Sequence, residues 1–263
     1  MALEPGPARS HVRLRRGLGI GAGLATAGLL ILGLLVAPTD AVQGQPQRLM
    51  YLHVPAAWVA YLAFAVTLVA SVAYLWRRDL RWDARAQAAA EIGAGLTALT
   101  LVLGSLWGRP VWGVWWAWDP RLVSTAVLLL VYVGYLGVRG LSADRHVNAR
   151  RAAVIGVLGF VEVPIVHFSV LWWRSLHQPP TIVQAGAPPI AATMLTALLT
   201  GVVAFTLLGA WIYLRRLDQL TAQLAAPVAD PPGPAAADTS TVDDPAAAPA
   251  AAPTIHVKNG VLR

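Results

Sequence analysis

Six apolar stretches, each of about 20 residues, dominate this sequence and leave it few ways to fold. They cover approximately residues 18–37, 56–76, 87–106, 122–139, 152–171 and 190–214. A helix needs roughly 20 apolar residues to cross a bilayer, and in lipid every backbone polar group must be paired within the protein. The stretches are near-continuous and rich in Leu, Ala, Val and Gly, whereas the strands of a membrane barrel alternate in polarity. We therefore predict an all-α integral membrane protein, a bundle of six transmembrane helices.

Arginines flank these stretches unevenly, and this asymmetry predicts the topology. Hydrophobic residues make up 57% of the 263 residues, and the net charge is +7. Loops that stay in the cytoplasm carry an excess of Lys and Arg, so the arginine-rich side is expected to be cytoplasmic, with both termini on it. Topology accounts for the positive charge, and no nucleic-acid partner is expected. The arginines on this side are Arg13, Arg15, Arg16, Arg77, Arg78, Arg81, Arg85, Arg139, Arg145, Arg150, Arg151, Arg215 and Arg216.

The ends of the chain differ in composition from its apolar body. The basic "HVRLRR" before the first stretch resembles the start of a signal peptide, but the apolar run that follows is longer than the usual roughly 7–15 residues, which favours a retained helix. We predict a flexible cytoplasmic N-terminus (1–12), a six-helix membrane domain (13–217) and a disordered Ala/Pro-rich cytoplasmic tail (218–263). The chain has no cysteine and no P-loop motif, which excludes disulfides, thiolate chemistry and an ATPase site of its own.

Five of the 11 tryptophans lie in "WGRPVWGVWWAWDP", residues 107–120, between the third and fourth stretches. Tryptophan is enriched at both membrane interfaces, so simple anchoring is one interpretation. The tryptophans are concentrated on the side away from the arginines, however, and a belt would be shared between both sides. If the segment is extended, Trp112, Trp116 and Trp118 lie on one side of it. If it is helical, Trp112, Trp116 and Asp119 lie on one side instead. Such a surface suits a flat apolar ligand.

Two histidines flank this segment in sequence and are expected on the same, outer side. His53 is placed just outside the second helix, where Pro55 suits a helix start, and His177 follows the fifth. A lone histidine near a helix end is more often a hydrogen-bonded structural residue. Two of them beside an aromatic surface could instead bind the iron of a porphyrin from opposite faces. In that case Arg48 and Arg121 are candidates for contacts with the two propionates, because arginine forks match carboxylates.

Two further ionisable residues are expected inside the membrane. His167 lies about three turns inward of His177, and Glu162 lies deeper still. Ionisable groups at such depths are costly and often functional. His167 has no partner at equal depth, so a buried hydrogen-bonding role is favoured for it over an electron-transfer site with two histidines.

Three motifs together resemble a known family. "WGVWWAWD" is similar to the WGxxWxWD motif of the tryptophan-rich haem-handling proteins, and "YLHVPAAW" and "PIVHFSVLWWRSLHQ" resemble the haem exporter C members of the cytochrome c maturation system. The resemblance covers roughly residues 13–215. It implies a multi-pass protein of the bacterial inner membrane that holds haem b non-covalently at the periplasmic face. It also implies His53 and His177 as iron ligands, and Trp112, Trp116, Trp118 and Asp119 as the platform.

The resemblance further implies the partners. Proteins of this family load haem onto a membrane-anchored periplasmic haem chaperone, in which a histidine bonds to a haem vinyl group. They work within an ABC-type complex that contains an ATPase subunit, a second membrane subunit and a small single-helix subunit. Whether such a loading protein counts as an enzyme is a matter of definition, because no acid–base pair for bond making is evident in the sequence.

Three alternatives stay open at this point. A permease subunit that exports a small molecule would place polar groups near the bilayer midplane, often at broken helices. A relative of the apocytochrome c haem lyases would carry more helices and an additional buried histidine pair. A b-type redox subunit would retain its haem permanently and would be recognised by its spectrum.

Overall fold

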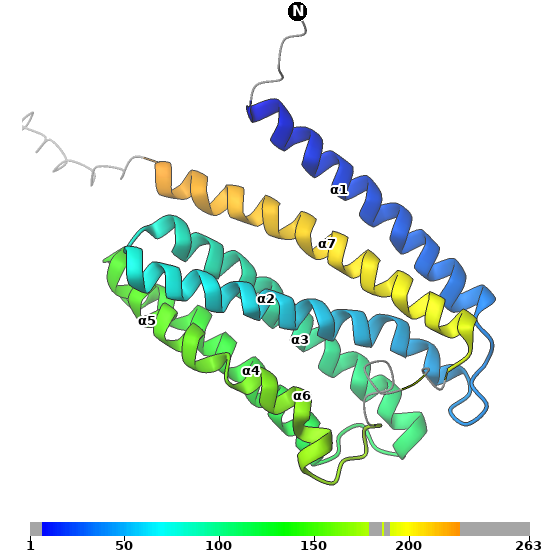
Figure 1. Ribbon diagram of the computed structural model, residues 1–263. Coiled ribbons are helices and arrows are strands. Elements are labelled where there is room, and N and C mark those ends of the chain that lie inside the picture. The colour runs from blue at the N-terminus through cyan, green and yellow to red at the C-terminus, as the bar shows by residue number, and fades with distance from the viewer. Residues whose placement is uncertain (1–6, 179–185, 187–189, 227–263) are drawn as a thin grey trace, which may run out of the picture. The chain divides into compact units, whose positions relative to one another are not determined.

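The computed structural model describes residues 7–178, 186 and 190–226, and every regular element in this part of the chain is helical (Figure 1). Within these residues, six helical stretches are long and apolar enough to cross a membrane, as predicted. The α5 and α6 helices together form one of these stretches. The helices are α1 (Pro7–Leu30, continued by a π-helical turn, Ile31–Val36), α2 (Met50–Arg77, preceded by a 3-10 turn, Gln45–Leu49), α3 (Leu80–Trp112), α4 (Pro120–Gly137, followed by a 3-10 turn, Val138–Gly140), α5 (Arg145–Gly159), α6 (Glu162–Trp172) and α7 (Ala192–Ala225).

The first and last helices, α1 and α7, extend beyond the limits that hydropathy suggests. The α1 helix begins at Pro7, inside the predicted N-terminal segment 1–12, and α7 continues past residue 217 to Ala225. The extension of α7 has a packing reason, because its Leu220 is buried against Ala84 and Ala88 of α3. Residues 1–6 and 227–263, which make up the rest of the two predicted tails, lie outside the described residues.

The main core lies between α2, α3, α4, α5 and α6. The α3 helix contributes alanines to its packing: Ala88, Ala89 and Ala90 are all fully buried, Ala90 in this core and Ala88 against α7. Small side chains allow helix backbones to approach closely in a membrane, where packing rather than water exclusion drives helix association. On the α4 side, the ring of Tyr132 stacks on Phe64 with centroids 3.7 Å apart. This close packing fixes the rigid frame that carries the site at one end.

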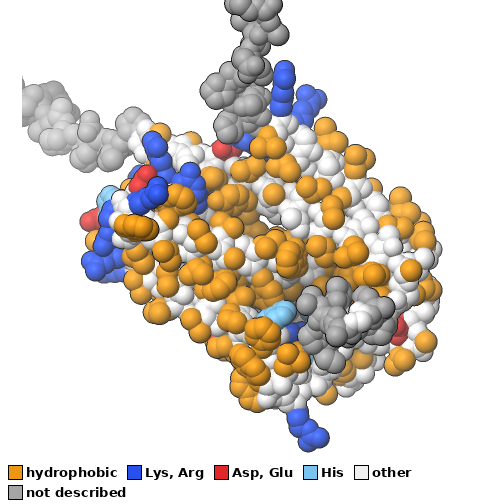
Figure 2. All heavy atoms as spheres, viewed as in Figure 1, with side chains coloured by type: hydrophobic (Ala, Val, Ile, Leu, Met, Phe, Trp, Pro, Cys, Tyr) orange, Lys and Arg blue, Asp and Glu red, His pale blue; other side chains and the backbone are white. Residues whose placement is uncertain are grey.

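Ion pairs hold the arginine-rich end of the bundle together, and Figure 2 shows most of the visible Lys and Arg side chains gathered toward this end. Two pairs are bidentate, a geometry that suits arginine and carboxylate. Arg139 contacts both carboxylate oxygens of Asp83, at 2.6 and 2.9 Å, and Arg216 contacts both of Glu91, also at 2.6 and 2.9 Å. These pairs join α3 to the end of α4 and to α7.

The start of α2 differs from the sequence prediction. We expected His53 just outside the helix and Pro55 at its beginning, but α2 begins at Met50 and Pro55 lies inside it. Met50 and Tyr51 are buried in a cluster shared with α1 and α7, so tertiary packing favours a helical turn upstream of the proline. Because proline has no N–H, the carbonyl of Tyr51 lacks its usual helical donor, and Gly201 of α7 packs against that carbonyl.

This close approach leads to a stability prediction. A Cβ atom at Gly201 would lie 2.7 Å from the Tyr51 carbonyl oxygen and 3.0 Å from Cγ of Pro55. Backbone atoms cannot yield as a flexible side chain can, so Gly201→Ala is expected to lower the free energy of unfolding by about 1–3 kcal/mol. Thermal unfolding in detergent measures the effect. The matched control is Gly134→Ala in α4, where nothing lies within 4 Å of the added carbon, and an equal loss in both variants would contradict the prediction.

The fifth predicted helix is broken. We expected one run over residues 152–171, but α5 ends at Gly159 and α6 begins at Glu162, with a turn between them. Pro164 explains the position of the break, because it cannot donate to the carbonyl of Phe160, one turn earlier. The α6 helix packs chiefly against α4. The break separates the direction of α6 from that of α5.

Candidate functional site

An open cavity of about 210 Å³ lies at the end of the bundle away from the arginine–carboxylate pairs, and both predicted histidines line it. We call it the outer cavity. It lies among the loop before α2, the start of α2, the end of α3, the start of α4 and the segment after α6. The lining residues are Gln43, His53, Val54, Gly104, Trp107, Gly108, Val111, Trp112, Arg121, Leu176, His177 and Gln178.

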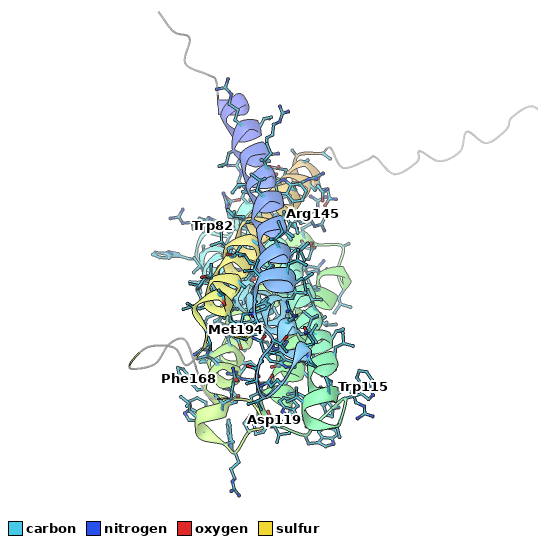
Figure 3. The ribbon with its side chains drawn as sticks, turned by 90° about the vertical axis from the view of Figure 1, so that its right-hand side faces the viewer. Trp82, Trp115, Asp119, Arg145, Phe168 and Met194 are labelled. Atoms are coloured by element: carbon cyan, nitrogen blue, oxygen red, sulfur yellow. The ribbon has the colours of Figure 1, made fainter. Side chains whose placement is uncertain are left out.

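Asp119 organises one side of this cavity. Figure 3 shows it at the same end as Trp115, with Trp82 and Arg145 toward the opposite end. Its Oδ1 accepts from the Arg121 N–H at 2.9 Å and so caps α4, which begins at Pro120. Its Oδ2 accepts from the Ser175 hydroxyl at 2.8 Å and from the Leu176 N–H at 2.5 Å. A single buried carboxylate therefore ties the segment after α6 to the start of α4.

The same carboxylate orients His177. Oδ1 of Asp119 lies 3.3 Å from Nδ1 of His177, and the imidazole is half-buried. Ligating histidines usually donate one ring N–H to an acceptor of this kind, which fixes the ring and leaves the other nitrogen for the metal. With Nδ1–H donated to Asp119, the lone pair of His177 is on Nε2.

The electrostatics of the pair favour a charged carboxylate and a neutral imidazole. Burial raises the pKa of Asp119, but the three hydrogen bonds donated to it outweigh burial, so the pKa lies below its ordinary value. Burial lowers the pKa of His177, and Arg121 adds to this effect while Asp119 opposes it, so the net pKa is also below the ordinary value. Because only a neutral imidazole can bind a metal, this environment prepares His177 for ligation near neutral pH.

The α3 helix supports both imidazoles with tryptophans. The ring of Trp107 meets His53 edge-on with centroids 5.9 Å apart, and Trp112, five residues later, meets His177 in the same way at 5.0 Å. The indole N–H of Trp107 donates to Oε1 of Gln43 at 2.8 Å, which fixes the ring from the loop before α2. Nδ1 of His53 is buried and has no hydrogen-bond partner among the described residues. Packing against Trp107 thus helps to position the His53 ring.

Arg121 brings a positive charge between the two histidines. It lines the outer cavity together with His53 and His177. Its Nη2 donates to the His167 carbonyl of α6 at 2.8 Å, and its Nε is buried without a partner in the described part of the chain. It can therefore still receive an acceptor such as a carboxylate.

Other predicted site residues lie elsewhere. Trp116 and Trp118 pack edge-on against each other at 6.0 Å but are 37% and 86% exposed and do not line the outer cavity. Arg48 donates to Gln45 and to the carbonyls of Gly33 and Ala37, which closes the end of α1. It too is not a lining residue.

Sequence reasoning missed three residues that shape the site. Trp107 and its partner Gln43 line the cavity, and Ser175 anchors the segment of His177 through Asp119. Trp107 had a usable signal, because it lies five residues before Trp112 in a stretch that can continue as a helix. Gln43 and Ser175 gave no signal, because their roles depend on contacts between segments distant in sequence.

The arrangement defines a class of protein: a multi-pass membrane protein with a two-histidine, tryptophan-supported cavity at one end. The family model for Heme exporter protein C matches residues 10–227. The Heme exporter protein C of Bradyrhizobium diazoefficiens is 42% identical over 194 residues, 72% of this chain and 73% of the relative. That of Escherichia coli is 38% identical over 204 residues, 75% of this chain and 82% of the relative, and that of Haemophilus influenzae is 38% identical over 188 residues, 71% and 76% respectively. The chain belongs to the Heme exporter protein C family of cytochrome c biogenesis.

Proposed function

We propose that this protein binds haem b at the periplasmic face of the bacterial inner membrane and loads it onto the periplasmic haem chaperone of cytochrome c maturation. The observation that carries the proposal is the shared cavity of His53 and His177. Both termini would be cytoplasmic, which the concentration of arginines at the opposite end supports. The name of the relatives, Heme exporter protein C, points to the same ligand.

The residues present fit haem as a cargo. His53 and His177 would be the axial ligands of the iron, a pairing that needs no covalent attachment. Trp112 would lie beside the ring, and Arg121 would take a propionate through its unpaired Nε. Trp116 and Trp118, exposed at the rim, would form the outer part of the platform. For Arg48, whose donors are engaged with the end of α1, the proposed contact with a propionate is the weakest element.

Haem supplies the reactive vinyl edge, and this chain supplies positioning. The two histidines would set the height and tilt of the ring, and Asp119 would hold His177 in its ligating tautomer. The chain would act with the ABC ATPase subunit, the second membrane subunit and the small single-helix subunit, since it has no nucleotide site of its own. Membrane lipid surrounds the bundle.

The test is direct. The full chain, purified after expression in a haem-producing host, is expected to show the absorption spectrum of six-coordinate haem with two nitrogen ligands. Mixed with the soluble domain of the chaperone, it should transfer haem, as shown by haem that stays on the chaperone after denaturation. A purified chain that neither contains nor accepts haem would contradict the proposal.

A glycine beside His53 allows a finer test. A Cβ atom at Gly104 would lie 3.1 Å from Cε1 of His53, so Gly104→Ala must displace the ring by a few tenths of an ångström. Overpacking costs about 1–3 kcal/mol, and if the ring must overcome this cost to reach its ligating position, haem affinity is expected to fall by about 5–150-fold. Titration of the Soret band measures it. The matched control is Gly95→Ala on the same helix, which has nothing within 4 Å of the added carbon. Equal affinities in the two variants would contradict the assignment of His53.

A further inference from the structure

A second cavity continues the site into the membrane-spanning part of the bundle. This inner chamber has a volume of about 70 Å³ and shares His53, Gly104, Arg121 and His177 with the outer cavity. It reaches down α3 as far as Thr97, seven residues below Gly104, which corresponds to about 10 Å along a helix. The histidine site therefore opens toward the outer surface and continues toward the interior of the bundle as a narrow chamber, which must widen to admit a porphyrin.

The inner chamber is lined mainly by α2, α3 and α4, and α6 meets it on the side that faces Tyr61. Tyr61 of α2 and Val166 of α6 both line it, while α6 packs chiefly against α4. Tyr61, which lines the chamber, is half-buried, and its ring meets that of His167 edge-on with centroids 6.3 Å apart. The buried role expected for His167 is wrong, because its side chain is exposed. The flank of the bundle seen in Figure 2 is covered mostly by hydrophobic side chains, as expected for a surface in lipid. Where α2 and α6 meet, at the seam between Tyr61 and His167, the described residues make no backbone–backbone hydrogen bond. The seam is closed by side chains alone.

We call the seam between Tyr61 and His167 the membrane port. Its chemistry matches a flat apolar ring that carries carboxylates on one edge. The chamber wall combines apolar side chains with hydroxyl groups, including those of Tyr61 and Thr97. Arg121 lies next to the port, because it is on α4 and donates to the His167 carbonyl on α6. It therefore places a guanidinium beside the port and in the same chamber as the two histidines, where a carboxylate could pair with it.

We infer that haem reaches the two histidines sideways from the outer leaflet of the membrane, edge-first, through the membrane port between α2 and α6. This inference rests on the proposed function and adds the route. Haem is poorly soluble in water and dissolves in lipid, so a lateral opening at the depth of the site gives it a path that avoids the aqueous phase. Tyr61, Arg121 and His167 are then positioning residues for uptake rather than iron ligands.

The absence of cysteine makes a clean test available. The full chain with Tyr61→Cys and His167→Cys, prepared without haem, is crosslinked in detergent with a short bifunctional thiosulfonate and placed in vesicles whose lipid contains haem. Uptake is followed by the Soret band. Crosslinking is expected to slow uptake by at least about tenfold, because it bars the opening, and reduction should restore the rate. Haem bound before crosslinking should be retained.

The control crosslink joins Gly21→Cys on α1 to Leu207→Cys on α7, positions that pack together away from the port, and should leave uptake unchanged. An unchanged rate in the crosslinked port variant, or crosslinking that also releases haem already bound, overturns the inference. The uncrosslinked protein separates the two proposals. If it takes up haem in a manner that needs both histidines, the proposed function holds whatever the crosslink does.

A second variant covers the case in which the double substitution itself prevents binding. His167 is exposed, so His167→Cys alone is expected to fold and can be labelled with a bulky thiol reagent. Labelling should slow uptake as the crosslink does. Leu171→Cys, one turn further along α6 and 59% exposed, is the matched control and should not slow uptake when labelled. Equal rates in the two labelled proteins overturn the port.

Discussion

Replacing both His53 and His177 with alanine is expected to abolish haem binding while the protein still inserts and folds. Loss of a residue that merely supports a metal ligand typically costs about 10–100-fold in affinity, so loss of both ligands should cost at least about 100-fold. Neither imidazole carries the fold, because His177 has a single side-chain hydrogen bond and Nδ1 of His53 has none among the described residues. The haem content of the purified membrane protein and its absorption spectrum measure the result.

The control is His146→Ala, which removes an imidazole that stacks on Tyr74 at the opposite end of the bundle. It should leave haem content unchanged. Removing one ligand at a time adds a second readout. In His177→Gly the vacated space adjoins the outer cavity, so imidazole added to the solution is expected to restore part of the original spectrum. A double variant that retains native haem and spectrum would move the site elsewhere and overturn the proposed function.

Asp119→Asn is expected to give the second largest effect, a loss of about 10–100-fold in haem affinity with little change in membrane insertion. Asparagine is as good a helix cap as aspartate, so α4 should still begin at Pro120. The amide carries no charge, however, and cannot stabilise the donated Nδ1–H of His177 as a carboxylate does. Loading of the chaperone should fall in parallel with affinity.

A matched control is present in the same chain. Asp79 caps α3 in the same manner, accepting from the Arg81 N–H at 2.8 Å, but lies at the arginine-rich end, away from the cavity. Asp79→Asn should therefore preserve haem binding. If both variants lose haem equally, the effect of Asp119 is on helix stability. If neither loses it, the carboxylate is not needed to orient His177.

The spans could be predicted because they depend on local sequence. An apolar run of sufficient length specifies a membrane helix wherever it occurs, and the start of α4 at Pro120 follows from the Asp-Pro pair alone. The helix limits at Met50 and at Phe160 could not be predicted in this way. The first depends on burial of Tyr51 against other helices, and the second on how a proline inside an apolar run is accommodated, by a kink or by a break.

The site was predicted in part. Placing both histidines on one side of the membrane required only the topology, and the shared cavity follows from that once the helices are packed. The positions of the tryptophans were harder to predict. Their spacing shows that several lie on one side of the segment, but it does not show whether that side faces the cavity or the exterior. Trp112 continues α3 and points to the cavity, whereas Trp116 and Trp118 follow the helix end at Gly113 and remain exposed. No sequence pattern distinguishes these two outcomes.

The bonds of Asp119 to Ser175 and Leu176 have a consequence for biogenesis. A ribosome that has delivered four spans to the membrane has made His53 and the carboxylate, but not the segment that brings the second imidazole. Half-made copies would thus hold iron porphyrin from one side at most. Capture of a reactive pigment would be postponed until the fifth span is inserted and its trailing segment has docked, which would spare the cell from haem trapped on unfinished chains.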